Sequence, residues 1–174
     1  MVKNKCIFID RDGVINRSKV VNGKPFAPLK FSEFIFLPKV KKAVDIFKNK
    51  KFITIIISNQ PDISKKKLKF SELNKMNQKL LKYLKIDDIF ICTHSKEAKC
   101  SCRKPKVGLF KKAIKKYSID IKSSYMIGDR KIDIDAGNKL NLKTIFIDKN
   151  YREDKPINFD YRCKSLYKSL NFIK

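Results

Sequence analysis

The sequence lacks any apolar run long enough to cross a membrane. Its longest run, Phe52 to Ile57, is far shorter than the roughly 20 residues that a membrane-spanning helix needs. A strand-like apolar segment begins at Cys6, which leaves no room before it for the successive regions of a secretory signal. We therefore expect a cytoplasmic protein without a membrane partner.

Linkers and internal repeats are also absent from the sequence. No segment rich in Pro, Gly or Ser divides the 174 residues, of which 43% are hydrophobic. A chain of this length is long enough to bury a core of its own. We expect one domain over residues 1–174, and we expect a monomer.

Acidic residues are few compared with basic ones. The chain has 42 Lys and Arg residues against 17 Asp and Glu, which gives a net charge of +25. The excess is nearly all Lys, and it is spread along the expected helices, as at Lys39, Lys41, Lys42, Lys48 and Lys50, and not gathered into one stripe with aromatic residues. This pattern favours a solvated surface that attracts anions over a dedicated nucleic-acid surface. A nucleic-acid-binding protein, or a phosphatase acting on nucleic-acid ends, remains the alternative from another class.

Apolar runs of strand type alternate with helical patterns along the chain. The strands are expected at residues 5–10, 52–57, 88–92, 124–127 and 143–147. The helices are expected at residues 38–49, 71–84, 107–117 and 131–140, with a weak terminal helix at 164–172. Such alternation predicts an α/β fold of Rossmann type, in which helices cover both faces of a parallel sheet.

Polar residues follow several of these strands. Asp10 and Asp12 follow the first strand, Ser58-Asn59-Gln60 follow the second, and Asp129 follows the strand that ends near Ile127, with Asp133 four residues later. Ligands of open parallel sheets bind beyond the carboxyl ends of the strands. We therefore expect these side chains, together with Arg103 and Lys104, to share one rim of the sheet.

This set of residue types suits phosphoryl transfer. Carboxylates can hold Mg²⁺, a hard cation that prefers oxygen ligands. One carboxylate can attack phosphorus, and a second can protonate the leaving oxygen and then activate water. A hydroxyl and a lysine can hold the phosphoryl oxygens. The alternative for Asp10 and Asp12 alone is an Asx turn that closes a strand.

The sequence resembles the haloacid dehalogenase superfamily of phosphohydrolases. The matching segments span most of the chain in the superfamily's order: Phe8 to Asn16, Ser58 to Gln60, Cys102 to Lys106, and Ile127 to Arg130 with Asp133. The gaps between these segments are too short for a cap domain, so the resemblance implies a capless member with an open site.

The resemblance also implies the role of each site residue. Asp10 would be the nucleophile and Asp12 the general acid/base, while Ser58 and Lys104 would hold the phosphoryl group. Lys104 is preferred to Lys106 for this role. Asp10, the backbone carbonyl of Asp12, and Asp129 would bind Mg²⁺, with Asp133 supporting the metal. The residues implied to contact the substrate are Asn16, Asn59, Gln60 and Arg103.

A cluster of soft ligands precedes Arg103. Cys92, His94, Cys100 and Cys102 lie within eleven residues and include the only histidine of the chain. Three cysteines and one histidine suit a tetrahedral structural Zn²⁺ with no open position. Five cysteines in all, an odd number, argue against a disulfide framework in a cytosolic chain. We expect zinc to brace the segment that presents Lys104; the alternative is three free thiols and an incidental histidine.

Two groups of zinc-braced, capless superfamily members are similar to this chain. The endings of the first two motifs, Gly13 to Asn16 and Ser58 to Ile63, are more similar to the D-glycero-D-manno-heptose 1,7-bisphosphate 7-phosphatases, which act in the biosynthesis of nucleotide-activated heptose for surface polysaccharide such as lipopolysaccharide. The short spacer between His94 and Cys100 also resembles the histidinol-phosphate phosphatases. Residues 24–28 fall in a loop where capless members contact substrate. The resemblance therefore implies a phosphorylated small-molecule substrate, with heptose bisphosphate preferred.

Overall fold

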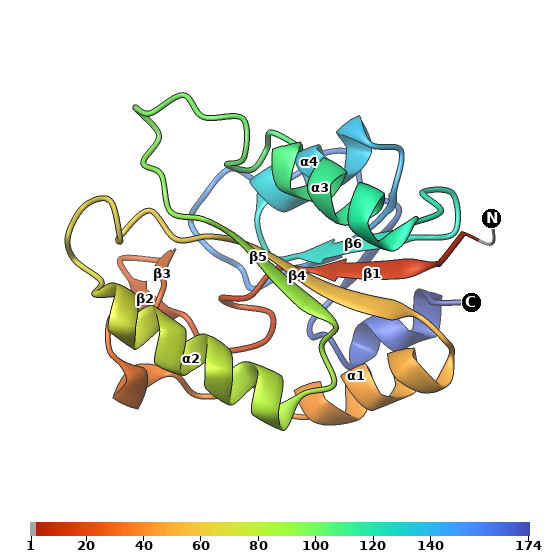
Figure 1. Cartoon of the computed structure of the whole chain (residues 1–174), viewed down its shortest axis with the longest axis horizontal. Helices are drawn as coiled ribbons and strands as arrows, with labels where there is room; N and C mark the ends of the chain where they lie inside the picture. Colours follow the sequence, from red (N-terminus) through yellow and green to blue (C-terminus); the bar gives the residue numbers. More distant parts are fainter. Residues whose placement is uncertain (1–2) are drawn as a thin grey trace.

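A six-stranded parallel sheet forms the centre of the molecule (Figure 1). The structure, a computed structural model, describes residues 3–174. The strands lie in the spatial order β5-β4-β1-β6-β7-β8. Their bounds are β1 Cys6–Ile9, β4 Ile53–Asn59, β5 Asp88–Cys92, β6 Tyr125–Gly128, β7 Lys143–Ile147 and β8 Tyr161–Cys163. The predicted fold class is confirmed: a Rossmann-like parallel sheet with helices on both faces.

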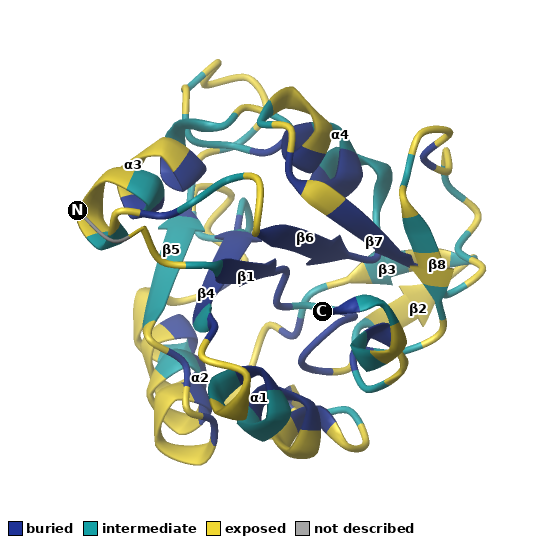
Figure 2. Cartoon of the chain, turned by 90° about the vertical axis from the view of Figure 1, so that its right-hand side faces the viewer, coloured by how far each residue is buried: buried dark blue, intermediate teal, exposed yellow. Residues whose placement is uncertain are grey.

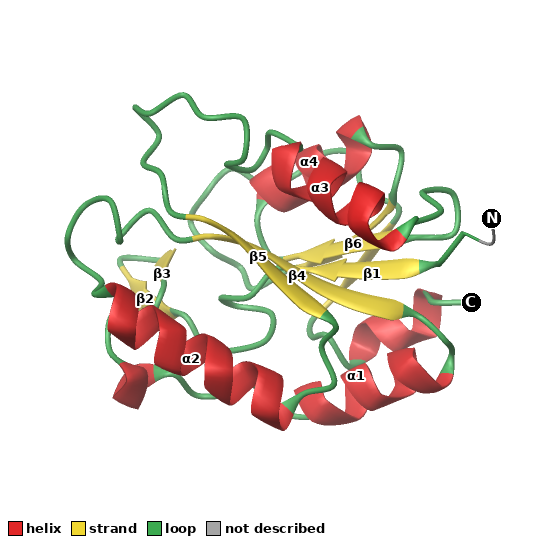
Figure 3. Cartoon of the chain, viewed as in Figure 1, coloured by secondary structure: helices red, strands yellow, loops and turns green. Residues whose placement is uncertain are grey.

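Four α-helices cover the two faces of the sheet. They are α1 Val40–Asn49, α2 Phe70–Tyr83, α3 Gly108–Tyr117 and α4 Lys131–Lys139, each within two residues of its predicted bounds. Figure 3 shows α1 and α2 below the sheet and α3 and α4 above it. Among the described residues, no helix is both long and apolar enough to cross a membrane.

The two faces arise from the alternation of side chains along each strand. Ile7 and Ile9 of β1 belong to a core cluster with residues of α1 and α2, whereas Cys6 and Phe8 belong to a second cluster with residues of α3 and α4. Successive strand residues point to opposite sides of a sheet, so an uninterrupted apolar strand is suited to burial on both faces. The central strands are accordingly buried, and the exposed residues lie mostly on the helices and loops (Figure 2).

The order of the strands reverses direction at β1. From β1 the chain adds β4 and then β5 on one side, and β6, β7 and β8 on the other. Crossover connections leave on opposite faces at such a point, which opens a crevice at the carboxyl end of the central strand. Asp10 directly follows β1 and therefore lies at this crevice.

The sequence did not predict three short strands. β2 Lys19–Val21 and β3 Lys24–Phe26 form an antiparallel hairpin, and β8 adds a parallel edge strand to the sheet. The hairpin turn has a recognisable signal, because Asn22 and Gly23 both adopt positive φ angles (50° and 78°), as a two-residue Asn-Gly turn requires. β8 has no such signal, since its three residues are neither buried nor flanked by turn residues on both sides.

One predicted helix is wrong in type and extent. Residues 164–172 were expected to form an α-helix, but only Lys168–Phe172 are helical, as the 3-10 helix η2; a second 3-10 turn, η1, spans Phe31–Glu33. Leu166 and Ile173 are buried in the core, so packing of single apolar residues, not a helical stripe, fixes the C-terminal segment. Within the described residues, the connection from β1 to α1 holds only the hairpin, η1 and loops, and no inserted domain. The single domain over residues 1–174 stays a prediction.

Candidate active site

The side chain of Lys104 reaches the carboxylate of Asp10 in the crevice beyond β1. Its Nζ lies 2.7 Å from Asp10 Oδ1 and donates a second hydrogen bond to the carbonyl of Ile57 at 2.6 Å. Only 2% of Lys104 is exposed. Asn59 fixes the lysine's backbone, because its amide accepts from Lys104 N–H and donates to the Lys104 carbonyl. The cation is therefore held in place from two neighbouring strands.

Two further carboxylates complete a buried acidic cluster. Asp133 Oδ1 lies 2.7 Å from Lys104 Nζ, and Asp133 Oδ2 accepts a hydrogen bond from the backbone N–H of Arg130 at the start of α4. One oxygen from each of Asp10, Asp129 and Asp133 lies within 4.8 Å of the others. The cluster holds three carboxylates and one ammonium group, so a divalent cation would balance its formal charge.

Burial and mutual repulsion act on these acids together. Burial raises the pKa of Asp10 to about 7, with Lys104 opposing the shift and Asp133 adding to it. Burial, followed by the charges of Asp10 and Asp133, raises the pKa of Asp129 well above its usual value. A cation among them would favour the ionised carboxylates. The same neighbours, Asp10 and Asp133, raise the pKa of Lys104 despite its burial, which keeps the ammonium group charged.

The surroundings of Asp129 fit a magnesium ligand. Both of its side-chain oxygens are buried and lack well-formed hydrogen bonds among the described residues, although the nearby Tyr151 hydroxyl acts to lower the pKa of the carboxyl. A buried carboxylate with so few donors is costly unless another group compensates it. Gly13 leaves the space for this carboxylate, since a Cβ at residue 13 would lie 1.8 Å from Asp129 Oδ2. The oxygen-only donor set of Asp10, Asp129 and Asp133 suits Mg²⁺.

Asp12 is held by a separate set of donors. Its carboxylate accepts hydrogen bonds from Arg11, from Asn16 Nδ2 (2.9 Å) and from Gln60 Nε2 (2.6 Å). Arg11 is fully buried, and its guanidinium group also lies over the ring of Phe34. Gln60 Nε2 also donates to Ser58 Oγ at 2.9 Å. Asp12 therefore has a fixed position beside Asp10 while remaining partly exposed.

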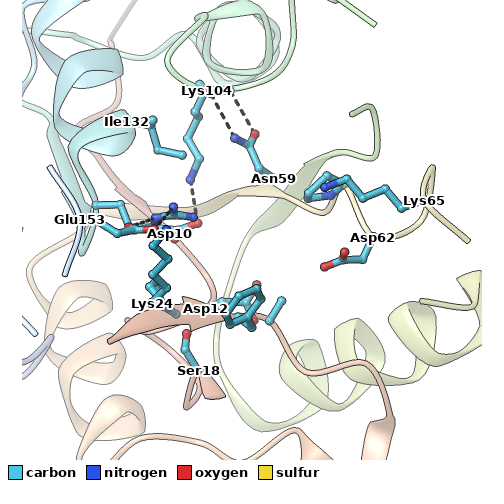
Figure 4. Close-up of a pocket in the computed structure, with 15 residues that line it drawn as sticks. Asp10, Asp12, Ser18, Lys24, Asn59, Asp62, Lys65, Lys104, Ile132 and Glu153 are labelled. Carbon is cyan, nitrogen blue, oxygen red and sulfur yellow. Dashed lines mark hydrogen bonds and ion pairs between the residues drawn. The ribbon is translucent and has the colours of Figure 1, made fainter. Parts of the chain in front are cut away.

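A cavity of about 270 Å³ opens over this rim. Figure 4 shows Asp10, Asp12 and Lys104 on one side of it, and Asp62 and Lys65 at the other. Residues 24–27 of the hairpin form another part of the wall, as do Ser18, Asn59, Ile132 and the ion pair between Arg130 and Glu153 (2.6 Å). The cavity is therefore lined by charged and polar groups around the Asp10 carboxylate.

The predicted zinc ligands meet at one point in the loop after β5. Cys92, His94, Cys100 and Cys102 each place a ligand atom within 4.8 Å of the others. The sulfur of Cys102 lies 3.1 Å from that of Cys92 and 3.2 Å from His94 Nδ1. Burial raises the pKa of Cys92 to about 12, whereas hydrogen bonds, that from Cys102 first, outweigh burial and lower the pKa of Cys100 to about 6. Three sulfurs and one imidazole nitrogen at this spacing fit a tetrahedral Zn²⁺.

The chain is similar to known phosphatases over almost its whole length. The D-glycero-alpha-D-manno-heptose-1,7-bisphosphate 7-phosphatase of Campylobacter jejuni is 33% identical, and the match covers 99% of this chain and 98% of that protein. A family model described as "HAD-hyrolase-like" matches residues 101–170. The chain belongs to the haloacid dehalogenase superfamily of phosphatases.

This phosphatase is also similar to part of a bifunctional protein and to a solved phosphatase structure. The histidine biosynthesis bifunctional protein HisB of Blochmanniella floridana is 33% identical over 149 residues, which are 83% of this chain but only 41% of HisB. The crystal structure of D,D-heptose 1.7-bisphosphate phosphatase from B. bronchiseptica, complexed with magnesium and phosphate, matches with a TM-score of 0.80 at 22% identity, covering 97% of both chains. At this identity the structural likeness shows the fold alone.

The structure brings most of the predicted site residues of this phosphatase together. Asp10, Asp12, Asn59 and Lys104 line the cavity, with Asp129 adjoining them in the acidic cluster. Lys104 and not Lys106 lies beside Asp10, because the ammonium group of Lys106 donates to the carbonyls of Lys99 and Cys100. The chemical roles assigned to these residues stay predictions.

Besides Asp129, four residues predicted to bind the phosphoryl group or the substrate are not among those that line the cavity. Ser58, Gln60 and Asn16 are nearly or fully buried and bond within the network around Asp12. The guanidinium group of Arg103 donates to the carbonyl of His94, at the zinc loop. The predicted contacts of Asn16, Gln60 and Arg103 with substrate therefore have no support from this geometry.

The sequence analysis did not predict several residues of the cavity wall. Ser18, Lys65, Arg130 and Glu153 were not singled out, although each lines the cavity. The Asn22-Gly23 turn is a signal that indicates the hairpin beside Ser18. For Lys65 and Glu153 no pattern in the sequence points to the site, since one lysine among many and one acid in a loop carry no periodicity.

Proposed function

We propose that this phosphatase hydrolyses a phosphomonoester with Mg²⁺ and an aspartyl-phosphate intermediate, and that it removes the 7-phosphate of D-glycero-D-manno-heptose 1,7-bisphosphate. The observation that carries the mechanism is the contact of Lys104 with Asp10 inside the acidic cluster. The substrate rests on the Campylobacter relative, whose match spans nearly all of both chains. The reaction would serve the formation of nucleotide-activated heptose for surface polysaccharide. The expectations of a monomer and of a cytoplasmic location stay predictions.

In the first step, the phosphoryl group is transferred to the enzyme and each reacting group has one role. A carboxylate oxygen of Asp10 forms a bond to phosphorus as the bond from phosphorus to the leaving sugar oxygen breaks. Asp12, in its protonated form, donates its proton to that oxygen. Lys104 offsets charge on the phosphoryl oxygens, and Ser58, whose oxygen accepts a hydrogen bond from Gln60, donates through its own O–H to one of them. Mg²⁺, held by Asp10, Asp129 and the backbone carbonyl of Asp12 with support from Asp133, would neutralise phosphate charge while the anionic nucleophile approaches.

The second step returns the enzyme to its starting state. Asp12, now ionised, takes a proton from a water molecule, and the water oxygen attacks phosphorus as the bond to Asp10 breaks. Phosphate leaves, with Asp10 ionised and Asp12 protonated as at the start. The donors from Arg11, Asn16 and Gln60 hold the Asp12 carboxylate in position for this proton transfer.

Histidinol-phosphate phosphatase is the second candidate. HisB proteins match over the same region, although this chain spans less than half of their length. The short spacer between His94 and Cys100 also favours a histidinol-phosphate phosphatase. Both reactions use the same phosphoryl chemistry, so only the groups that contact the rest of the substrate separate them.

Competition between the two substrates tests the proposal. Purified enzyme with Mg²⁺ is given heptose 1,7-bisphosphate and histidinol phosphate in one sample, and both products are followed. We expect a higher kcat/KM for the bisphosphate. A preference for histidinol phosphate would reject the substrate assignment and leave the phosphatase mechanism in place. Preferred hydrolysis of 3′- or 5′-phosphorylated oligonucleotides, with affinity that falls steeply with salt, would favour the nucleic-acid alternative.

A further inference from the structure

The cavity contains more cations than the phosphoryl-transfer chemistry uses. Four basic residues line it: Lys24, Lys65, Lys104 and Arg130. Lys104 is paired with Asp10 and Asp133, and Arg130 is paired with Glu153. Among the described residues, neither Lys24 nor Lys65 forms an ion pair. Two ammonium groups of the cavity wall are therefore available to an anionic ligand.

Lys65 lies at the end of the cavity remote from the nucleophile. In Figure 4 it stands across the cavity from Asp10 and Lys104, next to Asp62. A phosphoryl group that reacts with Asp10 must lie at the opposite end, so its leaving group extends through the cavity toward Lys65. Lys65 is thus placed to meet the distal part of a substrate and not the phosphate under attack.

The turn that carries Lys65 is well fixed. Backbone hydrogen bonds connect Lys65 to Pro61 and Lys67 to Asp62, and Leu68 at the end of the turn is buried in the core. The turn directly follows Gln60, which bonds to Asp12 and Ser58. The position of the Lys65 backbone is therefore determined by the same strand end that builds the reaction centre.

We propose that Lys65 binds the phosphate of the substrate that is not hydrolysed, and so determines the preference of this enzyme for a sugar bisphosphate over a monophosphate. This inference rests on the proposed function. An ammonium group without a protein partner gains a charge-assisted hydrogen bond from a phosphate. The neighbouring Asp62 carboxylate can accept hydrogen bonds from sugar hydroxyls between the two phosphates.

The same placement disfavours the rival substrate. Histidinol phosphate carries an ammonium group where the bisphosphate carries its second anion. Like charges at the remote end of the cavity raise the cost of binding, which separates two substrates by repulsion as well as by attraction. The contact with substrate that the sequence suggested for Arg103 is thereby assigned to Lys65, which lines the cavity, whereas Arg103 does not.

Kinetics with a matched pair of substrates test the role of Lys65. Wild type, Lys65→Ala, Lys65→Arg and Lys67→Ala are each assayed with heptose 1,7-bisphosphate and with heptose 7-phosphate. The expected result is that Lys65→Ala lowers the ratio of kcat/KM for bisphosphate over monophosphate by about tenfold to a hundredfold, the scale of one hydrogen bond to a charged group. The loss should appear mainly in KM, and Lys65→Arg should retain most of the ratio. Lys67 is exposed on the same turn and is not among the residues that line the cavity, so Lys67→Ala removes the same charge and should leave the ratio unchanged.

The outcomes separate this inference from the proposed function. If wild type prefers the bisphosphate and Lys65→Ala keeps that preference, the assignment of Lys65 is wrong while the proposed function stands. An equal fall in the ratio for Lys67→Ala would show that net charge and not position is responsible, and would also overturn the assignment. If wild type hydrolyses neither heptose phosphate, the proposed function fails and the inference fails with it.

Discussion

The amide nitrogen of Gln60 lies 2.6 Å from Oδ2 of Asp12, across 48 residues of sequence. The same nitrogen lies 2.9 Å from Ser58 Oγ, so one side chain connects the expected acid/base with the expected phosphoryl-binding hydroxyl. Gln60 is 1% exposed and is not among the residues that line the cavity. We therefore expect it to act on the reaction by positioning Asp12 and Ser58, and not by contact with the substrate.

Gln60→Met should lower kcat about tenfold or more, the scale of one lost hydrogen bond to a charged group, with a smaller effect on KM. Methionine has a similar volume but cannot donate a hydrogen bond, so Asp12 and Ser58 lose a donor that holds them in place. Circular dichroism should show a folded variant, so the fall in kcat would not arise from unfolding. Gln78→Met, on the exposed face of α2, is the control and should change neither quantity. A kcat of Gln60→Met equal to that of wild type would contradict the positioning role.

Asp10→Asn should lower turnover by several orders of magnitude, the scale seen when a covalent catalyst is removed. The amide keeps the shape but loses both the attacking charge and a metal ligand. Steady-state assays with Mg²⁺ in excess provide the measurement, and circular dichroism checks that the variant folds. Asp135→Asn, in a surface ion pair with Lys131, is the matched control with wild-type turnover expected. If Asp10→Asn retained a tenth of wild-type turnover, the covalent mechanism would be wrong.

Cys100→Ser should remove bound zinc and lower both Tm and activity, because structural zinc contributes directly to folding free energy. Elemental analysis of protein purified without chelator measures the metal, and one Zn²⁺ per chain is expected in wild type. Cys163→Ser is the control, since Cys163 is outside the cluster and its sulfur contacts only the carbonyl of Ser165 among the described polar atoms. Wild-type protein that is free of zinc yet fully active would rule out the structural metal.

Asp148→Asn should make the stability of the protein less dependent on pH. Asp148 is buried at the end of β7, where Arg162, Lys155 and Lys164 surround it. Although burial raises the pKa of Asp148, a hydrogen bond from Asn150 N–H and the contact with Arg162 outweigh it and hold the pKa below its usual value. A carboxyl whose pKa is lower in the folded state stabilises the fold above its unfolded pKa, and this contribution is lost as the pH falls through the folded value.

The difference in unfolding free energy between wild type and Asp148→Asn should thus be largest near pH 7, at about 1 to 3 kcal/mol, the worth of hydrogen bonds to a buried charge. It should begin to shrink near pH 4, where the carboxyl is protonated in the unfolded chain, and vanish only below the lowered pKa of Asp148 in the folded state. Urea unfolding at a series of pH values measures it. The exposed-pair control Asp135→Asn should change stability by less than about 1 kcal/mol at every pH. A difference for Asp148→Asn that does not depend on pH would contradict this account.

The sequence predicted the parts of the fold whose residues are buried in a regular pattern. The β-branched run from Ile53 to Ile57 is apolar on both faces of the sheet, and the stripe of Leu73, Met76 and Leu80 marks one face of α2, so both patterns directly reflect burial. Asp10 and Asp129 were predicted because charge at the end of a buried strand is costly without a function, whereas Lys104 was predicted from the resemblance to the superfamily. The four candidate zinc ligands were predicted because their chemistry and spacing do not depend on the fold.

The walls of the cavity could not be predicted in the same way. Glu153 reaches the site because Arg130, 23 residues earlier, binds its carboxylate, and Lys65 does so because one turn is folded back on Pro61. Such placements depend on tertiary contacts of loops, which have no periodicity to read. Arg103, in contrast, was predicted to contact substrate but does not line the cavity. Its position next to Lys104 in the sequence does not bring its side chain there.

The close approach of Asp129 to Gly13 restricts how this protein can evolve. The two residues come from different strand ends, yet any side chain at position 13 would occupy the space of the Asp129 carboxylate. A change of Gly13 would therefore displace the candidate metal ligand. Position 13 is thus restricted for as long as Asp129 keeps its place, whereas residues of the outer cavity wall are not subject to this restriction and can change without displacing that carboxylate.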